Sequence, residues 1–210
     1  MSKARTEAFS DAVIAVAITL LALDLHVPDP GGGFSLAHQL GEQWPNYAAY
    51  VVSFITIGII WINHHALLQR LVGVDHAILM LNLLLLLTIG VLPFSTALMA
   101  EYLDASQGQN LAAVVYGGSF LLMSLAFFAM QQHVLRAKRH LLQDHLTPEV
   151  RQAVLRRNAV GPLPYAAATV GGVLSPYLTL AICAAVAVFY ALPSTTFDVQ
   201  RQAPEGGQRS

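Results

Sequence analysis

The sequence predicts an all-α, polytopic membrane protein whose chain crosses the bilayer six times. Of its 210 residues, 55% are hydrophobic and only 11% are charged, whereas a soluble domain usually carries about 25% charged residues. Apolar runs approaching the length that a spanning helix needs, about 20 residues, recur along most of the chain. The distribution of basic residues between these runs alternates, as it does in multi-pass proteins. The single cysteine, Cys183, excludes an intrachain disulfide.

Six apolar segments are the predicted spans, and they are taken here in chain order. Their approximate bounds are 5–25, 44–70, 76–101, 109–136, 159–174 and 176–193. The last two are short, and the Ser175-Pro176 step between them favours a turn, although one long kinked helix is an alternative. We expect one compact membrane domain over 1–195, without an internal repeat. The polar tail over 196–210 is predicted to be disordered.

Basic residues set the orientation of these spans. All 11 precede the first span, follow the last, or lie between spans two and three or four and five; they are Lys3, Arg5, Arg70, Arg136, Lys138, Arg139, Arg151, Arg156, Arg157, Arg201 and Arg209. The connections 26–43, 102–108 and 174–177 contain no Lys or Arg. The positive-inside rule therefore predicts a multi-pass protein of the cell (plasma) membrane with both termini and the polar connector 137–157 in the cytoplasm.

The first span has two different faces when it is plotted at 100° per residue. The residues within about 60° of Val16 are Phe9, Ala12, Thr19, Leu20 and Leu23. The opposite half carries Ser10, Asp11, Ile14, Ile18, Leu21 and Leu25. One face therefore buries a polar pair and the other presents an apolar stripe with one hydroxyl group. Ordinary helix packing is the alternative explanation of that stripe, since membrane helices are apolar on all sides.

Polar groups of three spans are predicted to meet at one depth in the membrane. Asp11, His64, His65 and Asn82 each lie about 8–11 Å from the cytoplasmic end of their helix, at 1.5 Å per residue. An ionisable group in a span usually faces the bundle interior, and a carboxylate there requires donors. Candidate donors are the imidazoles, the Asn82 amide, the Trp61 indole and Arg5. We interpret the cluster, with Ser10, as a structural lock; a proton relay between Asp11 and His64 or His65 is the alternative.

No catalytic motif accompanies this cluster. HExxH, GxSxG, Walker and CxxC patterns are absent from the sequence. The adjacent His64 and His65 point 100° apart on a helix, so they are poorly placed to chelate one metal ion. We therefore expect no enzyme activity, no cofactor and no nucleic-acid partner. Pro93 is expected to kink the third span or to mark its outer end.

The residues of the first half resemble one family closely. Arg5, Phe9, Ser10 and Asp11 match the RxxxFSD hallmark of the transmembrane protein 175 potassium channels, in their short bacterial form. Further similar segments are ITLLAL at 18–23, GIIWINHH at 58–65 and LNLLLLLTIGVLPFST at 81–96. The resemblance is strong over about 5–101 and extends to the later spans by topology only.

This resemblance implies a homotetramer in which the first helix of each subunit lines a central pore. It places the constriction at Val16, a hydroxyl ring at Thr19, and further apolar lining at Leu20 and Leu23. Potassium is then the permeant ion, met in transit at Thr19, and the partners are the other subunits and the bilayer. Family members often carry a bulkier Ile or Leu at the Val16 position, which leaves Leu20 or Leu23 as alternative narrowest points.

The function predicted from the sequence is thus a potassium-permeable channel without a carbonyl selectivity filter. The outer acidic residues Asp24 and Asp29 either concentrate cations or simply end a solvated helix. A proton-coupled transporter that uses Asp11 with His64 or His65 is the first alternative, and a structural membrane protein without transport activity is the second.

Overall fold

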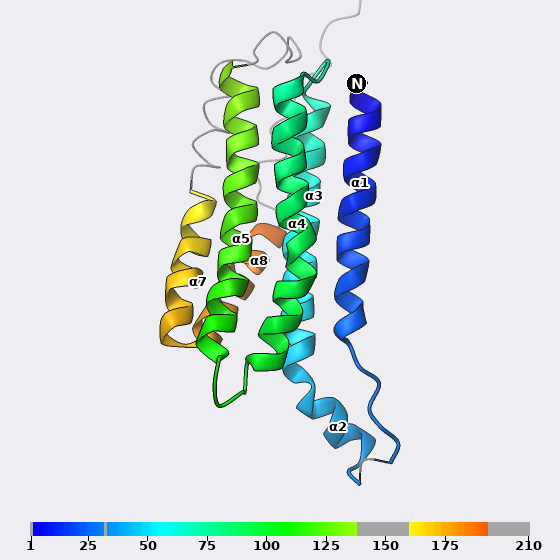
Figure 1. Cartoon of the computed structure of the whole chain (residues 1–210), viewed down its shortest axis with the longest axis vertical. Coiled ribbons are helices and arrows are strands. Elements are labelled where there is room, and N and C mark those ends of the chain that lie inside the picture. Colours follow the sequence, from blue (N-terminus) through cyan, green and yellow to red (C-terminus); the bar gives the residue numbers. More distant parts are fainter. Residues whose placement is uncertain (1, 32, 138–159, 193–210) are drawn as a thin grey trace, which may run out of the picture.

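The computed structural model describes residues 2–31, 33–137 and 160–192, and helices account for most of them (Figure 1). In chain order they are α1 (Lys3–Leu20), the 3₁₀ helix η1 (Leu21–Asp24), α2 (Leu36–Glu42), α3 (Trp44–Gln69), α4 (His76–Tyr102), α5 (Gln109–Gln132), the π-helix η2 (His133–Ala137), α7 (Pro162–Leu174) and α8 (Pro176–Ala191). Residues 138–157 of the polar connector and the predicted tail over 196–210 lie outside the described residues.

The fold is that of a multi-pass membrane protein. Within the part that the structure describes, four helices are long enough and apolar enough to cross a bilayer: Lys3–Asp24, Trp44–Gln69, His76–Tyr102 and Gln109–Arg136. The first begins two residues before the expected 5–25 and tightens into η1 at Leu21. The shorter helices α7 and α8 pack against each other, and the extended backbone of Ser175 (φ −160°, ψ 133°) separates them. They are two helices and not one kinked helix.

Local chemistry explains where several helices begin. The Asp75 carboxylate accepts a hydrogen bond from the backbone N–H of Ile78 (2.9 Å) and caps α4. Proline stands in the first turn of α3, α7 and α8, where its missing N–H costs no helical hydrogen bond. Pro93 does not mark the end of α4, because the helix continues to Tyr102. The hydroxyl groups of Ser95 and Thr96 both donate to the Leu92 carbonyl beside it.

Small residues let α7 approach α5 closely. A Cβ atom added at Gly117 would lie 3.0 Å from the Thr169 backbone nitrogen, and one at Gly172 would lie 2.9 Å from the Val114 nitrogen. Both distances are shorter than van der Waals contact, so only glycine permits this helix separation. The contact keeps the α7–α8 hairpin on the side of the bundle away from α1 (Figure 1).

A chain of hydroxyl groups joins the middle of the bundle. The Ser53 hydroxyl on α3 lies 2.8 Å from Thr96 Oγ1 on α4 and 3.1 Å from the Tyr116 hydroxyl on α5. All three side chains are buried. Because each group finds a partner without water, the chain fixes the three helices relative to one another. Helix α1 is not part of it and lies at the edge of the bundle, against α3 and α4 (Figure 1).

Candidate pore helix and its polar anchor

Helix α1 buries one face and leaves the other uncovered. Ser10, Ile14 and Ala17 are 0%, 1% and 3% exposed, and Leu21 of η1 is fully buried. These residues recur at spacings of three and four, so they form one stripe directed at α3 and α4. The half of the first span on which the sequence places Ser10, Ile14 and Leu21 is therefore the half that packs against the bundle.

The opposite stripe is uncovered by the rest of the chain. Val16 is 57% exposed, Leu20 42% and Leu23 73%, and Thr19 is exposed beside them. Part of this stripe lines an apolar groove of about 310 Å³ whose walls are Phe9, Ala12, Val13, Val16, Ala17, Leu20 and Gly90. A large apolar surface of this kind marks contact with lipid, with another subunit, or with a lumen that several copies enclose.

The Thr19 hydroxyl is exposed on this stripe. It donates a hydrogen bond to the carbonyl of Val16, one turn earlier, at 2.9 Å. Its only proton is therefore used within the helix, and the lone pairs of its oxygen point away from that bond. Such an oxygen is an acceptor, which suits a cation and not an anion.

Asn82 of α4 is the centre of the polar anchor on the buried face. Its Nδ2 donates to Ser10 Oγ at 2.9 Å, and its Oδ1 lies 2.7 Å from Nε2 of His64. Because an amide oxygen only accepts, the proton of this bond belongs to His64 Nε2. Ser10 donates in turn to the Thr6 carbonyl at 2.9 Å. Ser10, His64 and Asn82 are 0–2% exposed, so the anchor joins α1, α3 and α4 away from solvent.

Asp11 lies at the edge of this anchor and has a different partner. Its Oδ1 accepts a hydrogen bond from the Trp61 indole N–H at 2.8 Å, and both residues are partly exposed. His65 is not in the buried network; its Nε2 lies 3.1 Å from Gln69 Nε2 on the same helix, beside the Trp61 ring. Arg5 and Phe9 are exposed and do not belong to the buried network. No Arg5 side-chain hydrogen bond occurs among the described residues.

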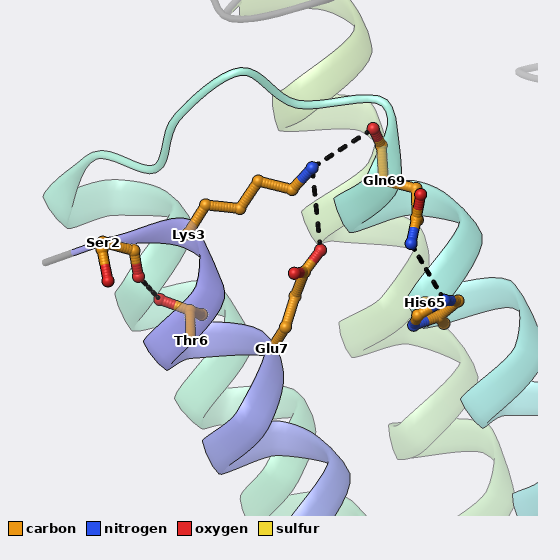
Figure 2. A network of polar contacts seen from close by, with 6 residues as sticks. All are labelled: Ser2, Lys3, Thr6, Glu7, His65 and Gln69. Atoms are coloured by element: carbon orange, nitrogen blue, oxygen red, sulfur yellow. Dashed lines mark hydrogen bonds and ion pairs between the residues drawn. The ribbon is translucent and has the colours of Figure 1, made fainter.

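Sequence reasoning missed a second contact between α1 and α3, at the N-terminal end of α1 (Figure 2). Lys3 Nζ lies 3.7 Å from Glu7 Oε1 and 3.4 Å from the backbone carbonyl of Gln69. The Lys-x-x-x-Glu spacing predicts the first contact. The second places a cation at the C-terminus of α3, where the helix dipole favours it, and only the packing of the two helices brings it about.

An all-helical membrane domain that leaves one apolar stripe of α1 uncovered has a surface suited to contact with lipid or with further subunits. The chain belongs to the TMEM175 family of channels. Its residues 5–93 match the family described as the endosomal/lysosomal potassium channel TMEM175. A protein of Streptomyces collinus that is named a potassium channel is 44% identical over 186 residues, which cover 89% of this chain and 90% of that protein. The family is one of ion channels and not of enzymes.

A solved structure shares the fold as well as the sequence. The crystal structure of a lysosomal potassium-selective channel TMEM175 homologue from Chamaesiphon minutus superimposes with a TM-score of 0.79 at 34% identity, over 90% of this chain and 96% of that one. A Gallus gallus protein named the endosomal/lysosomal proton channel TMEM175 is 43% identical over 117 residues, which cover 52% of this chain and 23% of that protein.

Proposed function

We propose that this chain forms a potassium-permeable cation channel in which the uncovered stripe of α1 lines the ion path. The observation that carries the proposal is the division of α1 into a packed face and an uncovered one. Val16, Leu20 and Leu23 are 57%, 42% and 73% exposed, and the exposed Thr19 donates its hydroxyl proton to the Val16 carbonyl of its own helix. We choose potassium as the permeant ion because the bacterial relatives are named as potassium channels.

The proposed assembly is a homotetramer with six spans per subunit, in which four α1 helices surround the axis. Helices α7 and α8 are the fifth and sixth spans of the 1–195 domain, and both termini lie in the cytoplasm of the cell. Support comes from the alternation of basic residues along the chain and from the full-length likeness to the Chamaesiphon channel.

Selectivity in this proposal comes from dehydration and not from a backbone filter. Rings of Val16, Leu20 and Leu23 would narrow the path to an apolar constriction that hydrated ions cross at a cost. The Thr19 ring supplies acceptor oxygens at that point. Because Na⁺ holds its water more tightly than K⁺, the constriction favours K⁺, modestly and without strict exclusion.

The proposed role of the polar anchor is structural. Ser10, His64 and Asn82 are buried on the face opposite the stripe, so they fix the rotation of α1 about its axis and thereby aim the stripe. The hydrogen bond from Trp61 to Asp11, at the edge of the anchor, supports the same orientation of α1. We expect Asp11→Ala chiefly to impair assembly, with proton dependence of transport unchanged.

Planar bilayer recordings of the purified protein test the channel. We expect single-channel currents in a K⁺ gradient and a reversal potential that shows preference for K⁺ over Na⁺. Thr19→Ala should change that preference, while Thr19→Ser, which keeps the hydroxyl, should retain it. Saturable, pH-coupled uptake without channel currents would instead establish the proton-coupled transporter, and Asp11→Ala with normal tetramers and lost proton dependence would establish the relay.

A further inference from the structure

A second groove lies at the end of the bundle away from the N-terminus, where η1 packs beside α3 and α4. Its volume is about 270 Å³. It is lined by Asp24, His26, Asn46, Phe94, Ala97, Leu98, Glu101 and Tyr102. This groove is separate from the Val16–Leu20 groove and from the buried anchor, and neither the proposed ion path nor its anchor uses the α4 residues that form it.

The α4 wall of the groove combines aromatic rings and a carboxylate on one helix face. Phe94, Leu98, Glu101 and Tyr102 follow one another at spacings of four, seven and eight residues from Phe94, which places them together. Phe94 is 64% exposed and Tyr102 39%, although both are large apolar rings. Part of each ring is thus left uncovered by the rest of the described chain.

The opposite wall of the groove carries a carboxylate, that of Asp24. The Asn46 amide N–H and the His26 Nδ1 both lie at hydrogen-bond distance from the Asp24 backbone carbonyl, at 3.2 and 3.0 Å. A carbonyl only accepts, so the His26 Nδ1–H and one of the two Asn46 N–H groups are used in these bonds. The Asp24 carboxylate is an acceptor that suits a positively charged guest.

The surrounding charge favours the same guest. Residues 6–69 and 71–135 contain no Lys or Arg. The groove is lined by two carboxylates, Asp24 and Glu101, and Asp29, Glu42 and Asp104 lie within five residues of its lining residues in the sequence. The potential here is negative without a compensating cation from this part of the chain, which attracts cations from solution.

We propose that this groove, formed by Asp24, Phe94, Glu101 and Tyr102, is a binding site for a small organic ammonium ion. Aromatic faces attract ammonium and quaternary ammonium groups, and carboxylates supply the counter-charge. A bare metal ion fits less well, because no group of three His, Cys, Asp or Glu side chains among the described residues is arranged to hold one. The volume of the groove also exceeds that of a single ion. The proposal does not depend on conduction, since binding is measured directly.

Choline binding to the purified full-length protein in nanodiscs tests the site. The matched control ligand is 3,3-dimethyl-1-butanol, which has the shape of choline without its charge. We expect choline to bind with a dissociation constant on the order of 1 mM, by equilibrium dialysis of labelled choline, and the neutral analogue to bind at least tenfold more weakly. Equal binding of the two ligands, or no choline binding at tens of millimolar, overturns the proposal.

Substitutions locate the bound ion. Phe94→Leu keeps an apolar side chain but removes the ring, and Glu101→Gln removes the charge; each should weaken choline binding by about threefold to tenfold. The controls make the same changes at exposed residues near α2, outside the groove, as Phe34→Leu and Glu42→Gln. They should change binding by less than twofold. If the controls weaken binding as much, the protein has only a diffuse negative surface and the proposal is wrong.

Discussion

Helices α1 and α5 have similar apolar composition but opposite positions in the molecule. Only 28% of the α1 span is buried inside the chain, against 56% of the α5 span. Helix α5 packs on α4, α7 and α8, whereas α1 contacts α3 and α4 along one side. Hydropathy therefore does not distinguish the two helices. They differ in how many sides of each are covered by other helices of the chain. The uncovered face of α1 is the surface that the proposed function assigns to other subunits and to ions.

The largest expected effect separates the two faces of the first span. Leu20 and Leu21 are neighbours, yet Leu21 is fully buried and Leu20 is 42% exposed. Leu21→Asn loses apolar contacts and buries an amide, so it should lower the free energy of unfolding by about 3 kcal/mol or more. Leu20→Asn should change it by less than about 1 kcal/mol while altering single-channel conductance. Denaturant titration of both variants in detergent measures the contrast, and equal losses would contradict the two-faced helix.

The close approach of α5 and α7 should be the next most sensitive feature. In Gly172→Ala the new Cβ would lie 2.9 Å from Val114 N and 2.9 Å from Thr179 Oγ1. Backbone atoms cannot move aside without separating the helices, so we expect a loss of about 1–3 kcal/mol in unfolding free energy. Gly58→Ala on α3 is the control, because a Cβ there meets no atom within 4 Å. It should be neutral or stabilising, and a loss equal to that of Gly172→Ala would show that helical glycines matter here for another reason.

The anchor of α1 should contribute less, because few polar groups form it. Asn82→Ala leaves His64 Nε2 and Ser10 Oγ without their partner, and we expect it to cost about 1–2 kcal/mol. Asn63→Ala is the matched control, since among the described residues the Asn63 amide donates to the Ile59 carbonyl of its own helix and to no other helix. Thermal unfolding monitored by size-exclusion chromatography compares the two. Equal melting temperatures would mean that apolar packing alone orients α1.

The contact at the end of α1 should have the smallest effect. Lys3→Met removes the approach to Glu7 and to the Gln69 carbonyl (Figure 2). The two side chains are 25% and 22% exposed, and ion pairs near the surface contribute about 0–1 kcal/mol and weaken as salt is added. We expect a small loss of stability at low ionic strength that disappears at high salt. A loss that persists in high salt would indicate that Lys3 acts through packing and not through charge.

The sequence by itself determined the properties that run along a helix axis. Apolar length predicted the long spans, and the 100° step between residues placed Ile14 and Leu21 on the same half of α1 as Ser10. Counting from the helix ends placed His64 and Asn82 at the depth of Ser10, where the structure joins them. Each of these properties depends only on spacing, which the order of residues fixes.

The tertiary structure decided which neighbours meet, since that depends on how each helix is rotated and how closely the helices pack. His64 contacts Asn82 while His65, 100° away, turns to Gln69. Asp11 takes its hydrogen bond from Trp61 and not from Arg5, and Lys3 reaches Gln69 on another helix. The groove lined by Asp24, Phe94 and Glu101 likewise exists only because η1 lies beside α3 and α4. Rotation and separation are settled by the fit of side chains from several helices at once, which no single segment of the sequence contains.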